Sequence, residues 1–250
     1  MTLHATLENG AKAFADRCWL RFEDAAWSYA EGNALCEKIA RGLVEQGVRP
    51  GDRVGLLFTN SPELVFCYFA CFKAGAVAVP LNTRFQVAET VYALNHCGTK
   101  VLVGQPGLVA PLLEARDQMP GLEHIFVTGN ALAGTQSFSA LSGRAPLPAV
   151  TNDQLAVILY TSGTTSRPKG VMHSHATLLR QNANYLEVLG AATYERCLLS
   201  LPLCHCAALG ICLLAGTEAG GTMTILPGFD PGAVLQAMPG TGSPLPVGCR

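Results

Sequence analysis

A run of small residues followed by a lysine occupies residues 160–170, which read YTSGTTSRPKG. Four of these small residues carry hydroxyl donors: Thr161, Ser162, Thr164 and Thr165. Gly163 allows backbone N–H groups to converge on an anion, and Lys169 adds a positive charge with three donors. Pro168 stiffens the backbone just ahead of the lysine. Hydroxyls, amides and one cation suit a polyphosphate better than a sugar or a metal ion, so the segment is a candidate phosphate-binding loop.

Two other interpretations of this segment compete with phosphate binding. A Ser/Thr-rich surface turn is common between a strand and a helix, but it does not explain the Pro-Lys-Gly that follows the hydroxyls. A Walker loop, G-x-x-x-x-G-K-[ST], does not fit, because Lys169 follows a proline. Gly170 also stands where that loop needs the Ser or Thr that binds magnesium.

A second group of reactive side chains is Cys204-His205-Cys206, within LPLCHCAAL at 201–209. Adjacent ligands on one short segment cannot easily all point at one ion, and no second Cys or His pair lies at zinc-site spacing. We therefore expect no metal site. His173 and His175 flank a helix start, where capping or solvated positions are the default, and Glu89 is expected to be a solvated charge.

Apolar runs and helical spacing alternate along the chain. Strands are expected at Trp19–Phe22, Trp27–Tyr29, Arg53–Phe58, Ala76–Val79, Lys100–Val103, His124–Val127, Leu155–Tyr160, Leu198–Leu201 and Thr222–Leu226. Helices are expected at 30–46, 62–73, 87–96, 108–117, 175–189 and 205–218, and 131–153 is expected to be a linker or long loop. Continuous apolar strands between helices predict a layered α/β fold, mostly parallel, with helices on both faces. Ligands bind at the carboxyl ends of such strands, where the hydroxyl-rich loop lies before its following helix.

The segment YTSGTTSRPKGV resembles the signature loop of the adenylate-forming superfamily, Y-[ST]-S-G-[ST]-T-G-x-P-K-G-V. Only Ser166 departs from that pattern, standing where glycine is usual. Four further stretches also resemble the family: WSYAE…ARGLVEQGVRPGDRV, NSPELVFCYFACFKAGAVAVPLNTRF, LPLCHCAAL and ILPGFDPGAVLQAM. The resemblance covers roughly residues 10 to 238 and is strongest to acyl-CoA synthetases of fatty or aromatic acids.

The resemblance implies a reaction and roles for particular residues. Family members join a carboxylic acid to AMP, using ATP and Mg²⁺, and then pass the acyl group to the thiol of CoA. The loop 161–169, with Thr161, Ser162, Gly163, Thr164 and Thr165, would embrace the β- and γ-phosphates, and Lys169 would neutralise charge there during catalysis. His205 would shape the acyl and adenylate pocket.

The resemblance also implies that this chain is an N-terminal portion. Family members are about twice as long, and their Y-G-x-T-E glutamate (which assists Mg²⁺), T-G-D segment and C-terminal domain lysine do not appear in the 250 residues. We expect subdomains at 1–150 and 151–238 and a divergent tail at 239–250, PGTGSPLPVGCR, which suggests a frameshift or gene-model error. Alone, the chain is expected to be inactive.

Composition limits the remaining possibilities. A net charge of −1 without a basic run gives no footprint for nucleic acid. Ten cysteines at irregular spacing, no secretion signal and no apolar run long enough to span a membrane predict a cytoplasmic protein with reduced thiols. Two alternatives to an acyl-CoA synthetase stay open. One is a non-catalytic remnant that binds nucleotide or serves as an interaction surface, and the other is an amino-acid adenylation domain of a peptide synthetase.

Overall fold

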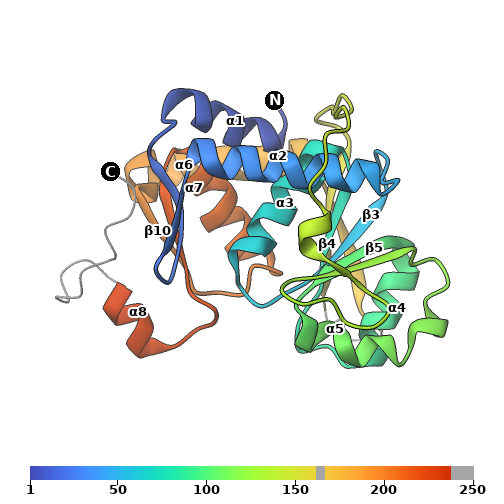
Figure 1. Ribbon diagram of the computed structural model, residues 1–250. Helices are drawn as coiled ribbons and strands as arrows, with labels where there is room; N and C mark the ends of the chain where they lie inside the picture. The colour runs from blue at the N-terminus through green and yellow to red at the C-terminus, as the bar shows by residue number, and fades with distance from the viewer. Residues whose placement is uncertain (162–166, 238–250) are drawn as a thin grey trace. The chain divides into compact units, whose positions relative to one another are not determined.

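The computed structural model describes residues 1–161 and 167–237 of the chain (Figure 1). These residues form two compact units that are discontinuous in sequence. Unit 1 comprises Met1–Leu35, Thr59–Phe66 and the described chain from Ala176 onward, and unit 2 comprises Cys36–Phe58 and Cys67–His175. Each unit contains one β-sheet. The continuous division expected near residue 150 stays a prediction.

Strands and helices alternate along most of the chain. The strands are β1 (Cys18–Phe22), β2 (Ala25–Ser28), β3 (Arg53–Leu57), β4 (Val77–Pro80), β5 (Thr99–Gly104), β6 (His124–Val127), β7 (Gln136–Ser137), β8 (Leu155–Thr161), β9 (Lys169–Ser174), β10 (Arg196–Leu199) and β11 (Thr222–Ile225). The α-helices are α1 (Leu3–Ala13), α2 (Tyr29–Glu45), α3 (Pro62–Ala74), α4 (Val87–Cys97), α5 (Pro106–Leu113), α6 (His175–Leu189), α7 (Ala215–Glu218) and α8 (Pro231–Ala237). A π-helix spans Ala207–Leu214, and short 3₁₀ turns span Arg116–Gln118, Phe138–Ala140 and Ala191–Tyr194.

Unit 2 is built on a seven-stranded sheet in the order β7-β6-β5-β3-β4-β8-β9. Every neighbouring pair is parallel except β8 and β9, which form an antiparallel pair at one edge. The interior strand β4 is buried along its whole length, as expected for a strand covered on both faces. This arrangement confirms the predicted mostly parallel α/β fold.

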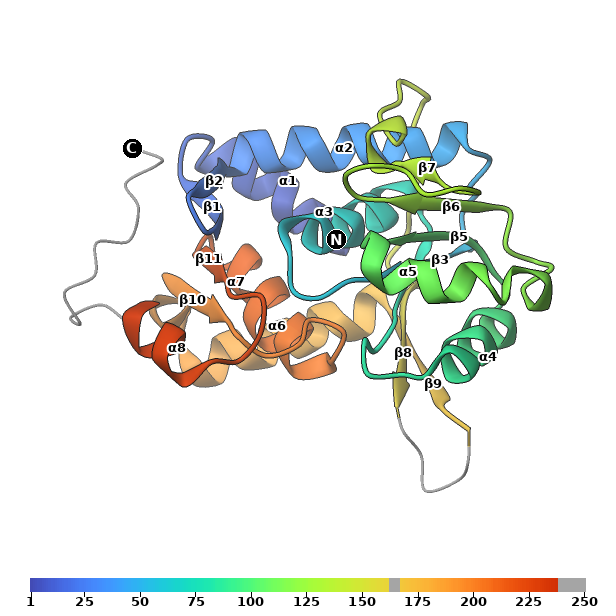
Figure 2. The ribbon, with the colours of Figure 1, turned by 60° about the horizontal axis from the view of Figure 1, so that its bottom comes forward.

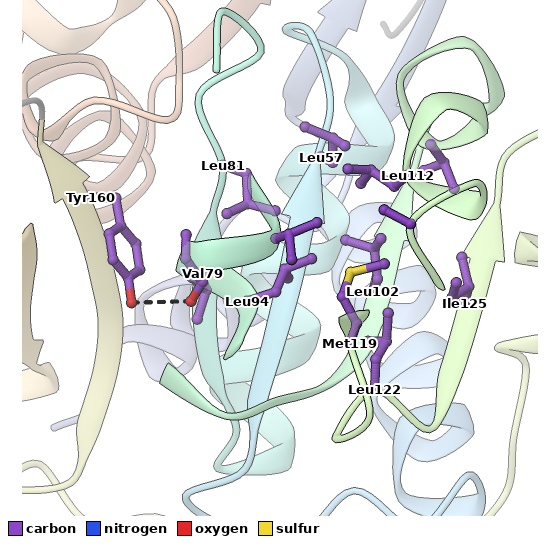
Figure 3. Close-up of a cluster of buried hydrophobic side chains, with 14 of the residues drawn as sticks. Leu57, Val79, Leu81, Leu94, Leu102, Leu112, Met119, Leu122, Ile125 and Tyr160 are labelled. Carbon is purple, nitrogen blue, oxygen red and sulfur yellow. Dashed lines mark hydrogen bonds between the residues drawn. The ribbon is translucent and has the colours of Figure 1, made fainter. Parts of the chain in front are cut away.

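A hydrophobic cluster joins one face of this sheet to α4 and α5, which lie side by side (Figure 2). The sheet contributes Leu57, Val79, Leu102 and Ile125, while Leu94 of α4 and Leu112 of α5 pack on them (Figure 3). All six side chains are almost fully buried, and burying an aliphatic side chain contributes about 1.5–3 kcal/mol. The cluster therefore fixes α4 firmly to the sheet.

Unit 1 is built on a four-stranded sheet in the order β10-β11-β1-β2. The β1–β2 hairpin was predicted, and β1 pairs in parallel with β11 (Figure 2). This pairing brings Leu20 opposite Met223. Two buried side chains also bond across this unit. The Trp19 indole Nε1 of β1 donates to Thr217 Oγ1 of α7 at 3.0 Å, and the Tyr29 hydroxyl donates to the Gly221 carbonyl at 2.8 Å. These bonds join residues about 200 positions apart in the sequence.

Several elements differ from the sequence-based expectation. Helices α1 and α8 and strand β9 were not predicted, and β10 begins two residues earlier than expected. The expected linker 131–153 contains the short strand β7 beside a 3₁₀ turn. Among the residues that the structure describes, none belongs to a helix with both the length and the apolar character needed to cross a membrane.

Candidate functional site

The candidate phosphate-binding segment connects β8 to β9. Thr161, the last residue of β8, is opposite Lys169, the first residue of β9, and both are exposed. The sequence predicted a loop leading directly into a helix, but Lys169 begins a strand, and the helix starts only at His175. The predicted phosphate contacts Ser162, Gly163, Thr164 and Thr165 lie outside the described residues, as does Ser166.

The hairpin lies at the carboxyl end of a strand in a parallel sheet. Strand β8 pairs in parallel with β4 through Ala78 and Val157. The last residue of β8 therefore lies at the carboxyl edge of the sheet, where α/β proteins bind ligands. Side chains alternate between the two faces of a strand, and directly opposed residues share a face. Because Tyr160 packs into the hydrophobic cluster, Thr161 and Lys169 project from the opposite face.

Close packing between β8 and β9 explains why a glycine, Gly170, follows the lysine. It is opposite Tyr160, and a Cβ at this position would lie 2.9 Å from Ile158 Cγ2 and 3.3 Å from the Tyr160 ring. Any larger residue would therefore push β9 away from the Tyr160 ring. The glycine of the Pro-Lys-Gly sequence lets β9 approach β8 closely and so helps to set the position of Lys169.

The Tyr160 hydroxyl ties β8 to α4 (Figure 3). It donates to the Ala93 carbonyl at 3.1 Å and lies 2.8 Å from His96 Nδ1. The hydroxyl has one proton and the carbonyl can only accept, so both bonds form together when His96 donates from Nδ1. Burial, reinforced by the nearby Cys97 thiol, raises the pKa of Tyr160 above its usual value, which keeps the hydroxyl neutral.

The predicted pocket residue His205 lies in unit 1, just before the π-helix Ala207–Leu214. Its side chain is exposed, its N–H donates to the Pro202 carbonyl at 3.0 Å, and its carbonyl accepts from Leu209 N–H at 3.1 Å. The neighbouring cysteines diverge, since Cys204 is buried and the Cys206 thiol lies 3.7 Å from Gln181 Nε2. In the described part of the chain, no three His, Cys, Asp or Glu side chains gather as a metal-ligand group.

Asn60 holds the segment that leads to His205. Its side chain is only 5% exposed. Its Nδ2 donates to the carbonyls of Leu199 (3.3 Å) and Leu201 (2.9 Å), and its Oδ1 accepts from Leu203 N–H at 2.8 Å. One amide thus bonds to three backbone groups of this segment, of which the Leu199 carbonyl also accepts from Leu226 N–H at 3.1 Å. This role was not predicted from the sequence, in which the only local signal is a polar side chain three residues after the buried strand β3.

Two other histidines lie near the hairpin. His173 is on β9, and burial lowers the pKa of its imidazole. His175 was expected to be solvated or capping, but it is fully buried, with its ring edge-on to Phe72 at 5.6 Å. A solvated position is therefore ruled out, because the residue packs against Phe72 of the same unit, a contact that its neighbours in sequence do not reveal.

Lys169 belongs to unit 2 and His205 to unit 1. Within its own unit, each residue has a defined setting: Lys169 on the exposed face of a hairpin, and His205 at the start of a helical segment held by Asn60. Their predicted roles in phosphate and acyl binding stay predictions.

Comparison with known proteins defines the class. Residues 7–240 match the family of AMP-binding enzymes, and the chain belongs to that family. It is 37% identical over 225 residues to a feruloyl-CoA synthase of an Amycolatopsis species, covering 88% of this chain and 43% of the relative. It is 34% identical over 209 residues to a long-chain-fatty-acid–CoA ligase of Mycobacterium tuberculosis, covering 83% of this chain and 41% of the relative.

Solved structures agree with this assignment. The fold matches an anthranilate CoA ligase crystallised with anthranoyl-AMP, with a TM-score of 0.86 and 27% identity. That match covers 94% of this chain and 47% of the ligase. The chain therefore spans less than half the length of these three relatives, which are ligases that join acids to CoA.

Proposed function

We propose that the chain is part of an AMP-forming acid–CoA ligase. A carboxylate oxygen of the acid attacks the α-phosphorus of ATP, and pyrophosphate leaves. The CoA thiol then attacks the acyl carbon, and AMP leaves. The observation that carries this proposal is the position of Lys169, exposed beside Thr161 at the carboxyl end of β8, in a chain of the AMP-binding enzyme family.

The residues of the hairpin fit the polyphosphate of ATP. Thr161 supplies a hydroxyl donor and Lys169 an ammonium group, and both project from the face opposite the hydrophobic cluster. We propose that Lys169 neutralises charge on the β- and γ-phosphates and then on the departing pyrophosphate. Such charge neutralisation and positioning supply most of the catalysis in phosphoryl chemistry. We propose His205 as a residue that shapes the acyl and adenylate pocket rather than one that transfers protons.

The proposed partners are ATP as its Mg²⁺ complex, a carboxylic acid and CoA. The named relatives act on aromatic and long-chain acids, so we propose a fatty or aromatic acid as the substrate class. We also propose a cytoplasmic location. The nine cysteines that the structure describes are free thiols, which supports a reducing compartment.

We propose that these 250 residues alone bind nucleotide but turn over little or no acid. The support is the chain's share of its relatives, 43% of the feruloyl-CoA synthase and 47% of the anthranilate ligase. Adenylation can be followed as exchange of labelled pyrophosphate into ATP. The isolated chain should show little or no exchange, and turnover near the rate of a full-length relative would overturn this part of the proposal.

Nucleotide binding is tested by thermal unfolding with and without MgATP. A ligand that binds only the folded state raises the unfolding temperature. MgATP should raise this temperature for the wild type and for Lys38→Ala, which removes an exposed lysine on α2, but much less for Lys169→Ala. Equal shifts for all three proteins would remove the proposed role of Lys169.

A further inference from the structure

We propose that one face of α4, formed by Tyr92, Ala93 and His96, is a platform that positions both arms of the β8–β9 hairpin. Tyr92 would then be a positioning residue for Lys169. The proposal deepens the function proposed above and rests on it where nucleotide binding is concerned. The platform itself is argued only from contacts within unit 2.

The first arm is tethered through Tyr160. Its hydroxyl bonds to the Ala93 carbonyl and to His96 Nδ1, and its ring meets the His96 ring edge-on at 6.0 Å. Two hydrogen bonds and a ring contact therefore join the end of β8 to consecutive turns of α4. Figure 2 shows α4 beside this hairpin.

The second arm is tethered through Arg167. Its guanidinium carbon lies 5.4 Å from the centre of the Tyr92 ring, within the range of a cation–π interaction. The Tyr92 ring in turn stacks on His96, with centroids 5.2 Å apart and planes inclined by 25°. His96 thus contacts both tethers, so the two arms are linked through a continuous set of side chains.

The helix that carries these side chains is itself well fixed. Residues 92 and 96 are one turn apart, and such residues lie next to each other on a helix surface. At the N-terminus of α4, Glu89 Oε2 accepts from Gln86 N–H at 2.8 Å, so Glu89 is a cap rather than the solvated charge expected. At the other end, Arg53 Nη2 donates to the Gly98 carbonyl at 2.8 Å, a favourable place for a cation.

The tether on Arg167 acts close to Lys169. Only Pro168 separates the two residues, and this proline is buried and has a fixed φ. A restraint on the Arg167 guanidinium therefore limits how far the backbone at Lys169 can move. With Tyr160 held on the opposite strand and Gly170 packed on its ring, both sides of the lysine are restrained.

The platform is tested without nucleotide by hydrogen exchange of the amides at 168–171. These amides exchange only when the segment opens. Loss of a cation–π contact at an exposed site should shift this opening equilibrium by about 2- to 5-fold. Tyr92→Leu should speed this exchange by about that factor. Tyr92→Phe, which keeps the ring, should exchange like the wild type, and unchanged exchange in Tyr92→Leu would overturn the platform.

A double-mutant cycle separates the tether from the charge of Arg167. Arg167→Gln should speed exchange in the wild type but add almost nothing in Tyr92→Leu, because the contact is already lost. Full additivity of the two effects would overturn the tether. Arg84→Gln, which removes the same charge from an exposed side chain of this unit, is the matched control and should exchange like the wild type.

The dissociation constant of MgATP then tests the link to function. Tyr92→Leu should weaken MgATP binding by about the same 2- to 5-fold, and Tyr92→Phe should restore it. Faster exchange with unchanged MgATP affinity would show that Tyr92 does not position Lys169 for phosphate. If the wild type itself fails to bind MgATP, the proposed function fails, while the exchange data still decide the platform.

Discussion

The ring of Tyr160 lies over Gly170, its partner across β8 and β9, with no room for a side chain between the two strands. Gly170 does not have a positive φ, so a larger residue there is opposed by packing rather than by backbone strain. Gly170→Ala should lower the free energy of unfolding by about 1–3 kcal/mol, as overpacking typically does. Urea denaturation measures this change.

Two companion variants make the Gly170 prediction specific. In an Ile158→Ala background, which removes the nearest atom, the cost of Gly170→Ala should shrink. Gly107→Ala, in α5 where an added Cβ meets nothing within 4 Å, should be neutral or slightly stabilising. Equal costs at positions 107 and 170 would show that the close approach of β9 to Tyr160 is not tight.

Asn60 should be intolerant of even an isosteric change. Asn60→Asp keeps the acceptor for Leu203 N–H but turns a carboxylate oxygen toward the carbonyls of Leu199 and Leu201. Loss of these bonds, with a carboxylate left facing two carbonyl oxygens, should cost about 1–3 kcal/mol in the free energy of unfolding at neutral pH. The same change at exposed Asn152 should stay within about 0.5 kcal/mol. A loss at Asn60 no larger than at Asn152 would mean that the three bonds contribute little.

His173 should make stability depend on pH. Burial lowers the pKa of this imidazole in the folded chain, whereas the unfolded chain keeps the ordinary value of about 6.5. The unfolded state therefore binds the proton more readily, and the free energy of unfolding should fall as the pH drops through about 6.5 toward the folded value. His173→Gln should flatten this fall, measured by denaturation between about pH 7.5 and 5.5. An unchanged slope would contradict the burial effect.

The fold was predictable where the signal is local. Strands β3, β6 and β8 are continuous apolar runs, and α3 begins at the Ser-Pro pair that predicted it. Thr161, where the hydroxyl-rich sequence begins, lies at the carboxyl end of β8 for the same reason, since a strand's direction fixes its end.

The rest depends on partners far along the chain. Strand β9 carries a glycine and a mixed exposure pattern, and only pairing with β8 makes it a strand. Asn60 gains its role from backbone groups 139 to 143 residues later. The contact of Arg167 with Tyr92 likewise requires the sheet that brings α4 to the hairpin. Sequence spacing alone cannot reveal such pairings.

The most direct test of the phosphate-binding hairpin compares the affinities of ATP and AMP by titration calorimetry. The β- and γ-phosphates are present only in ATP, so Lys169→Ala should weaken MgATP binding by about tenfold or more, as expected for a lost charge-assisted contact. AMP binding should be unchanged by the same substitution. An unaltered affinity for MgATP, or an equal loss for both nucleotides, would contradict the assignment of Lys169 to the polyphosphate.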